Sequence, residues 1–258
     1  MGDPEPRTHE TTDTSIAVLS AVAELEGPTA GEVAESLDIA HSTVHKHLQT
    51  LLANGLVVQS DGAYRLGLKL YHLGTKAKRR DSRYLLAREK VHEIAERTSE
   101  VVNFSVAENG RAITLFDSLE SGSLAGFESG QYFHLHGTAA GKAMLAEMRP
   151  DRVRAIIDQW GLPRLTANTI TDEDELFDEL EAVRERGYAV NEEEAWERLK
   201  AVAVPVRNPD GTVLGAMDVS GPPARLPYER ELARILREGV AELETALDMQ
   251  VHLVERQE

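Results

Sequence analysis

The sequence contains no cysteine, which excludes disulfide bonds and thiolate metal sites. It has no apolar run near the roughly 18 residues that a membrane-spanning helix needs. The N-terminal stretch MGDPEPRTHE also lacks the apolar core of a secretory signal. We therefore expect a soluble, cytoplasmic protein that does not bind a membrane.

Positive charge is scarce in the chain as a whole, and a net charge of −16 argues against nucleic-acid binding. The distribution argues the other way. Residues 41–83 carry eight Lys or Arg and two acids, whereas 30 acids and 16 bases follow from residue 99 onward. One short basic segment inside an acidic chain is typical of a phosphate-contacting surface.

The N-terminal part predicts a disordered tail over residues 1–12 and a winged helix-turn-helix domain over 13–74. The first helix starts at Thr14 or Ser15 and stops before Gly27. The residues at helical spacing that we expect to face inward are Ile16, Leu19, Val22 and Ala23.

Two more helices and a hairpin complete this domain. A short helix follows Thr29 as its N-cap, and the segment HSTVHKHLQTLLANG forms a third helix that ends at Gly55. The spacing of apolar residues then changes from a helical to a strand-like period on both sides of Asp61-Gly62. This pattern predicts a small β-hairpin, the wing.

A charged segment at 75–98 predicts a linker helix, and residues 99–258 predict an α+β domain with an antiparallel sheet. Two strands are expected around Glu108-Asn109-Gly110, a third at GSLAGF, a fourth at YAVN, and two more around Pro209-Asp210-Gly211. A C-terminal helix is expected from Pro227. Its predicted inward residues are Leu232, Ile235, Val240, Leu243 and Leu247.

The second helix of a helix-turn-helix enters the DNA major groove with its first residues. Here the outward residues at that position are polar or basic, and the wing can reach the DNA backbone or the minor groove. The predicted DNA-binding residues are His41, Ser42, Thr43, His45 and Lys46, with Tyr64 and Arg65 in the wing. The alternative is a winged helix that contacts another protein.

Other motifs predict no catalysis, cofactor or metal. GTAAGKA differs from a phosphate-binding loop by one missing residue and by Ala143 in place of the Mg²⁺-binding hydroxyl. His134 and His136 share a side of a strand, but no third ligand accompanies them. The run Glu192–Glu194 predicts a solvated face. No nucleophile elbow, HExxH or dinucleotide fingerprint is present.

Five segments, in order, give the chain a resemblance to the IclR family of transcriptional regulators: HSTVHKHLQTLLANGLV, YRLGLKLYHLG, LHGTAAGKAMLA, RGYAVNEEE and AVAVPVRNPDGTVLGAMDVSGP. The resemblance implies a dimer-forming DNA-binding domain and a C-terminal effector domain related to GAF and PAS sensors. It also implies homodimers or tetramers that bind double-stranded DNA at a palindromic operator.

The family's effector pocket, carried over by position, implies an effector site made of Ala139, Ala140, Asn191, Ala201, Asp218 and Ser220. This chain differs from the family at three of these positions. It has Asn191 where Asp is common, Ala201 where Cys is common and Asp218 where Ser is common. A carboxylate at Asp218 would repel an acidic ligand and favour a polyol, a sugar or an amine. Alternatively, Asp218 faces solvent or pairs with Lys200 or Arg198.

The sequence thus predicts a transcriptional regulator controlled by a small molecule. The alternative is an enzyme or a small-molecule-binding protein that uses its N-terminal domain only for protein interaction. Turnover would need convergent acid-base or nucleophilic groups, and the sequence shows no such set.

Overall fold

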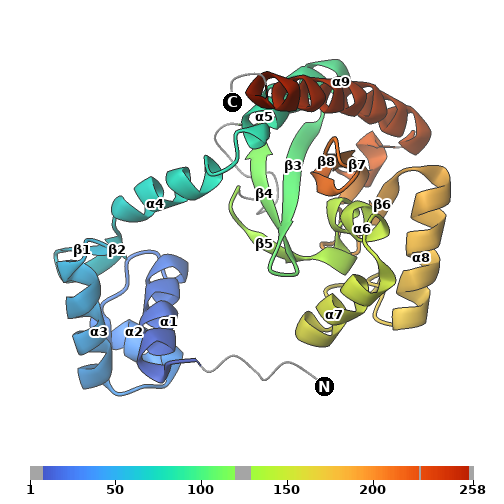
Figure 1. Ribbon diagram of the computed structural model, residues 1–258. Helices are drawn as coiled ribbons and strands as arrows, with labels where there is room; N and C mark the ends of the chain where they lie inside the picture. The colour runs from blue at the N-terminus through green and yellow to red at the C-terminus, as the bar shows by residue number, and fades with distance from the viewer. Residues whose placement is uncertain (1–7, 120–128, 227, 256–258) are drawn as a thin grey trace. The chain divides into compact units, whose positions relative to one another are not determined.

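A computed structural model describes residues 8–119, 129–226 and 228–255, and it divides into two compact units, 1–80 and 81–258. The ribbon in Figure 1 labels the helices and strands of each unit. No helix within these described ranges is long and apolar enough to cross a membrane. The predicted strand GSLAGF lies outside the described residues.

The first unit has the predicted winged helix-turn-helix order. It contains α1 (Glu10–Glu24), α2 (Ala30–Leu37), α3 (His41–Ala53), β1 (Val57–Ser60), β2 (Ala63–Leu66) and α4 (Lys69–Lys78). Thr29 caps α2 in a capping box with Glu32, as the sequence predicts for Thr29. Asp61 and Gly62 both have positive φ, which is the two-residue turn that joins twisted antiparallel strands.

The inward face of α1 differs from the prediction. Val18, Ala21 and Val22 are buried, whereas Ile16 is 58% exposed and Ala23 is exposed as well. Two apolar stripes fit the helical period here, and the contacts with α2 and α3 select the one centred on Val18. The helix also begins at Glu10, so the end of the predicted tail is helical, while residues 1–7 lie outside the described part.

The predicted linker helix over 75–98 is two helices. The first, α4, ends at Lys78, and α5 (Arg83–Thr98) belongs to the second unit. Between them the Asp81 carboxylate accepts hydrogen bonds from the backbone N–H of Arg83 and from its guanidinium. A side chain that satisfies nearby backbone donors in this way competes with helix continuation.

The second unit is built on one antiparallel sheet of six strands in the order β5-β4-β3-β8-β7-β6. The strands are β3 (Val101–Glu108), β4 (Arg111–Asp117), β5 (Tyr132–His134), β6 (Ala189–Glu192), β7 (Lys200–Arg207) and β8 (Val213–Gly221). The fold is therefore α+β, as predicted. The short strand β5 is an addition to the strands expected from the sequence.

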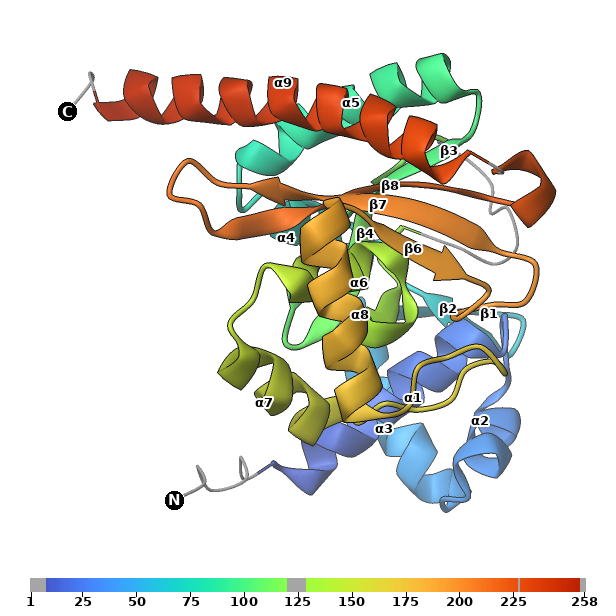
Figure 2. The ribbon, with the colours of Figure 1, turned by 90° about the vertical axis from the view of Figure 1, so that its right-hand side faces the viewer.

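Helices cover both faces of this sheet. On one face lie α5 and α9 (Glu229–Glu255); on the other lie α6 (Ala139–Ala146), α7 (Pro150–Trp160) and α8 (Glu173–Arg186), as Figure 2 shows. Val102, Phe104 and Met217 point into the first core, and Ala203 and Ala216 into the second. Alternation along each strand leaves polar residues of β3 and β8 on the α6 face.

Candidate functional sites

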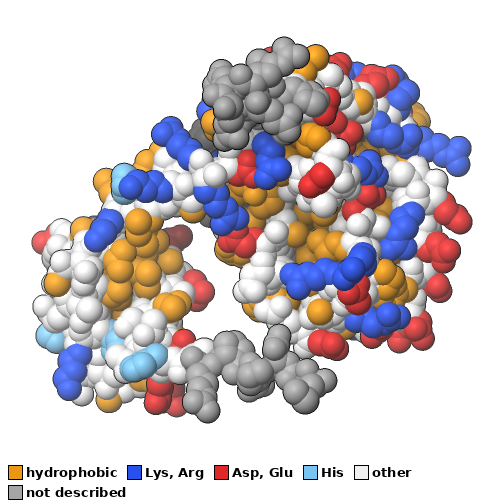
Figure 3. Space-filling view, viewed as in Figure 1, with side chains coloured by type: hydrophobic (Ala, Val, Ile, Leu, Met, Phe, Trp, Pro, Cys, Tyr) orange, Lys and Arg blue, Asp and Glu red, His pale blue; other side chains and the backbone are white. Residues whose placement is uncertain are grey.

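The third helix presents the predicted recognition residues to solvent. Val44, Leu48 and Leu51 are buried against the rest of the unit, which turns the opposite side of α3 outward. His41, Ser42, His45 and Lys46 are exposed and Thr43 is half-buried. The structure therefore brings these five residues onto one end of one helix, and Figure 3 shows histidine and basic side chains on the surface of this unit.

The start of α3 is also suited to an anion. Ala40 is the N-cap and supplies no side-chain hydrogen bond, and the first turn contains no acid. The first N–H groups of a helix attract phosphate when no side chain satisfies them. A hydrogen bond of 2.8 Å between Ser15 Oγ and His47 Nδ1 holds the helix against α1.

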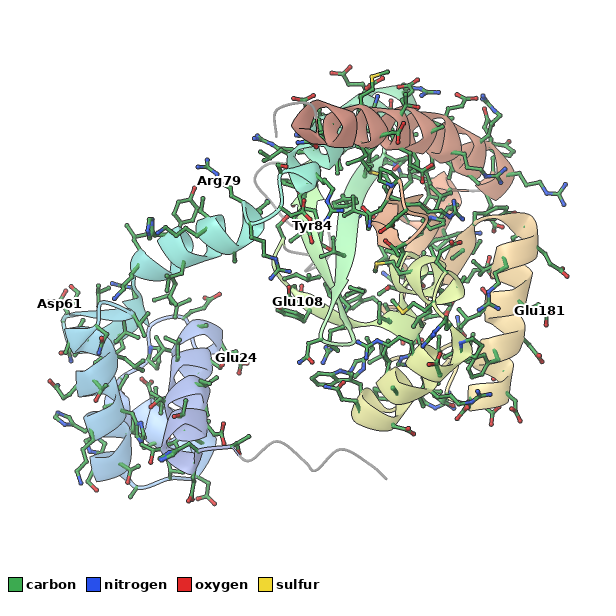
Figure 4. The ribbon with its side chains drawn as sticks, in the orientation of Figure 1. Glu24, Asp61, Arg79, Tyr84, Glu108 and Glu181 are labelled. Carbon is green, nitrogen blue, oxygen red and sulfur yellow. The ribbon has the colours of Figure 1, made fainter. Side chains whose placement is uncertain are left out.

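The wing requires one correction. Tyr64 is 3% exposed and belongs to the core of the unit, so it does not form a DNA-contacting surface. Strand alternation explains the difference, because neighbouring residues of β2 point to opposite sides and Tyr64 takes the inward one. Arg65 is exposed, and Asp61 lies at the tip of the hairpin (Figure 4).

All six predicted effector residues line one cavity in the second unit. The empty space among its lining residues amounts to about 370 Å³, a figure that includes open solvent. Its walls come from the six strands of the sheet on one side and from the start of α6 and the β6–β7 loop on the other. The further lining residues are Ser105, Ala112, Phe133, Thr138, Trp196 and Leu199.

The start of α6 forms one wall of this cavity. Thr138 caps the helix, since its hydroxyl accepts a hydrogen bond of 3.0 Å from the N–H of Gly141. Within the described residues, the N–H groups of Ala139 and Ala140 have no acceptor. A Cβ on Gly141 would lie 2.0 Å from the carbonyl oxygen of Leu135. The small residues of GTAAGKA therefore permit close packing of the helix start.

The opposite wall holds a buried polar cluster of Asn103, Asp218 and Ser220. The Nδ2 of Asn103 donates to Oδ2 of Asp218 at 2.8 Å and to Oγ of Ser220 at 3.0 Å. Burial raises the pKa of Asp218 to about 7, and the hydrogen bond from Asn103 opposes that rise. Asn103 is fully buried, and its Oδ1 has no partner among the described residues.

The alternative placement of Asp218 in solvent or in an ion pair is therefore wrong. Lys200 pairs with Glu192 and Glu229 instead. Sequence reasoning did not identify Asn103, although a polar residue inside the apolar strand VVNFSVA was a visible signal. Its partner residue lies across the sheet at Asp218, and the register that pairs them is set by the fold.

Asn191 lines the cavity, but its amide also holds the local structure. The side chain donates to the carbonyl of Gly137 at 3.1 Å and accepts from the N–H of Glu194 at 2.8 Å. These bonds join the end of β6 to the segment before α6. Ala201 lies beside it on β7, paired in register with both Asn191 and Ser220.

Glu194 is buried rather than solvated, contrary to the prediction for the acidic run. Its carboxylate lies 2.7 and 2.9 Å from Nζ of Lys142, which is 2% exposed and also 3.3 Å from Glu179. Burial raises the pKa of Glu194, and the Lys142 charge opposes that rise. This ion pair holds the β6–β7 loop, which includes Trp196, against α6.

His134 and His136 lie near one another, with ring centroids 5.6 Å apart. Burial lowers the pKa of both, to about 4 for His134, where Arg111 adds to the effect. The Nε2 of His136 donates to the carbonyl of Pro163 at 3.2 Å. In the part of the chain that the structure describes, no third metal-binding side chain joins a His, Asp or Glu pair.

The sequence matches two family models in the order of the two units. These are "IclR helix-turn-helix domain" over residues 11–61 and "Bacterial transcriptional regulator IclR C-terminal" over residues 84–245. The HTH-type transcriptional regulator BhcR of Paracoccus denitrificans is 33% identical over 223 residues, which cover 84% of this chain and 79% of BhcR.

Solved structures share the architecture. An IclR transcriptional regulator from Alicyclobacillus acidocaldarius aligns with a TM-score of 0.76 and 28% identity, over 93% of this chain and 100% of that one. An IclR homologue from Microbacterium hydrocarbonoxydans, complexed with 4-hydroxybenzoate, aligns with a TM-score of 0.73 and 23% identity, over 91% and 99% of the two chains.

The fold and the two sites define a transcriptional regulator with a helix-turn-helix DNA-binding domain and a C-terminal ligand-binding domain. The chain belongs to the IclR family. Proteins of this family are regulators and not enzymes, so the alternative of an enzyme with an N-terminal interaction module does not hold.

Proposed function

We propose that the protein binds a palindromic operator as a symmetric dimer, or as a pair of dimers, and that a small molecule in the α6 cavity controls this binding. Each recognition helix reads base edges in the major groove through His41, Ser42, Thr43, His45 and Lys46. Arg65 contacts the phosphate backbone. The exposed polar end of α3 is the observation that carries this proposal.

Self-association is supported by the surface of the first unit. Leu68 is 85% exposed and Tyr71 is 76% exposed, three residues apart at α4, and α4 has no buried residue of its own. Large apolar side chains exposed on one helix face favour a partner surface. A second copy of the chain is the partner we propose, since a palindromic operator requires two recognition helices related by symmetry.

The effector site that we propose consists of Ala139, Ala140, Asn191, Ala201, Asp218 and Ser220, and we include Asn103 because it donates a hydrogen bond to Asp218. A ligand that binds one conformation of this unit more tightly shifts the population of DNA-competent dimers. The complex of an IclR homologue with 4-hydroxybenzoate supports a small organic ligand as effector. We expect the protein in the cytoplasm, together with the DNA that it binds.

The test uses DNase protection of the DNA upstream of the protein's own gene. Ser42→Ala combined with Lys46→Ala should abolish specific protection, because both outward side chains that meet base edges and phosphate are removed. Glu181→Ala, an exposed position on α8 that points away from the sheet (Figure 4), is the matched control and should leave the footprint unchanged. An unchanged footprint in the double variant would refute the assignment.

A further inference from the structure

One wall of the cavity contains a carboxyl group, that of Asp218, which the described residues leave without a counter-ion. None of its twelve lining residues among those described is Lys, Arg or His. Asp218 is 5% exposed, and Asn103 provides the one hydrogen bond to its carboxylate, at Oδ2; Oδ1 has no donor among the described residues. A buried carboxylate in this state is costly to ionise unless another group brings a positive charge or hydrogen-bond donors.

The one Lys or Arg that is buried in the described part of the chain does not fill this role. Lys142 lies on α6, but its ammonium group is occupied by both oxygens of Glu194 and lies within 3.3 Å of Glu179. Among the described residues, no positive charge therefore compensates an ionised Asp218. A ligand that enters the cavity can supply it.

The facing wall has the opposite polarity. The N–H groups of Ala139 and Ala140, at the positive end of the α6 dipole, have no acceptor among the described residues. Asp218 and these two alanines line the same cavity. An anionic group placed at the α6 end would satisfy the two N–H groups.

Two aromatic side chains also line the cavity. Phe133 and Trp196 both line the cavity and pack edge to face, with ring centroids 5.1 Å apart. Aromatic faces attract ammonium groups, and the attraction adds to that of a carboxylate. A hydroxyl group could donate one hydrogen bond to Asp218, but it would leave the carboxylate charge uncompensated.

We propose that the effector is a small zwitterion of the amino-acid class, whose ammonium group binds Asp218 and whose carboxylate binds the N–H groups of Ala139 and Ala140. This inference rests on the proposed function, because it names the ligand of that same cavity. It also modifies the expectation from sequence: an ionised Asp218 disfavours acids that lack a positive group, but it favours an acid that carries its own cation.

Binding should also be coupled to protonation. The zwitterion requires an ionised Asp218, and burial raises the pKa of Asp218 in the empty cavity to about 7. Binding of an amino acid therefore releases a proton below that pH, and its affinity rises as pH increases toward 7. A plain carboxylic acid requires a protonated Asp218, so its affinity falls over the same range.

The experiment is calorimetry on the full-length wild-type protein with the twenty standard amino acids as probes. The tightest binder is then compared with its 2-hydroxy analogue and with its deaminated analogue, which keep the carboxylate and change one substituent. We expect the amino acid to bind at least about 10-fold more tightly than either analogue, a difference of about 1.4 kcal/mol. Its affinity should rise between pH 5.5 and 7, with proton release visible in buffers of different ionisation heat.

Asp218→Asn keeps the shape of the side chain and removes its charge, so it should reduce the preference over the hydroxy analogue to less than about twofold. Glu181→Gln, which removes an exposed carboxylate, is the matched control and should keep the preference. The pH profile is measured on the wild type, so the proposal can be tested even if Asp218→Asn does not fold.

The proposal is overturned if no amino acid binds below 10 mM, if either analogue binds as tightly, or if affinity falls with pH. Its failure is distinguishable from failure of the proposed function. A plain acid or a sugar that alters operator binding would overturn the zwitterion and leave the regulator intact. Loss of specific DNA binding altogether would remove the proposed function, whatever the cavity binds.

Discussion

Replacing Asp218 with asparagine should stabilise the ligand-free second unit, and the gain should depend on pH. In the folded protein burial raises the pKa of Asp218 from 3.8 to about 7. A carboxylate with a raised folded-state pKa makes the folded protein less stable as pH rises from about 4 to about 7, because the unfolded chain releases the proton first. Above pH 7 Asp218 is ionised in both the folded and the unfolded protein, so the loss of folding stability no longer changes with pH.

The size of the effect follows from the two pKa values. The interval from 3.8 to about 7, at about 1.4 kcal/mol per pKa unit, corresponds to about 4 kcal/mol. We take this as an upper bound, because the cavity is partly open and water relaxes around the charge. The expected gain for Asp218→Asn is therefore about 1 to 4 kcal/mol at pH 8 and near zero at pH 4.

Urea unfolding followed by tryptophan fluorescence measures this gain. The chain has two tryptophans, Trp160 and Trp196, and both belong to the second unit, so the signal reports on that unit alone. Unfolding curves at pH 4, 6 and 8 should show equal m-values and a growing difference in midpoint between variant and wild type. A variant that is less stable at pH 8, or a difference independent of pH, would refute the assignment of an uncompensated buried charge.

Three further outcomes are expected. Arg65→Ala should weaken DNA binding on all sequences alike and flatten the log-log salt dependence by about 0.9, measured by fluorescence anisotropy; a changed sequence preference would show that Arg65 reads bases. Lys142→Met should cost about 3 to 5 kcal/mol in urea unfolding, because Glu194 keeps a buried charge without its partner, and an effect below about 1 kcal/mol would contradict this. Leu68→Glu with Tyr71→Ser should shift sedimentation from dimer to monomer; an unchanged dimer would place the interface elsewhere.

Local signals were sufficient to predict the first three helices and the hairpin of the first unit, but not α4, which the sequence placed within one linker helix. Thr29 with Glu32 marks a helix start, and Asp61-Gly62 marks a two-residue hairpin turn, because each depends on residues within a few positions. The side that each element buries was harder to predict. Ile16 and Val18 both fit an apolar stripe of α1, and Tyr64 could face either side of β2 until the packing of the whole unit fixed its orientation.

Long-range pairing limited the prediction of the cavity. The six effector residues came from a family resemblance, and the structure places them around one space. Asn103 was missed because it meets Asp218 only through the register of β3 with β8, across 115 residues of sequence. The burial of Glu194 was not predicted for the same reason, because its partner Lys142 lies 52 residues earlier in the chain.

DNA recognition through α3 can be measured by selecting bound fragments from genomic DNA with the purified full-length protein. We expect enrichment of one inverted repeat, with half-sites about one helical turn or a multiple of it apart, and loss of that enrichment when Ser42 and Lys46 are both replaced by alanine. Fragments without a common motif, or the same inverted repeat selected by the double variant, would contradict a regulator that reads DNA through the start of α3.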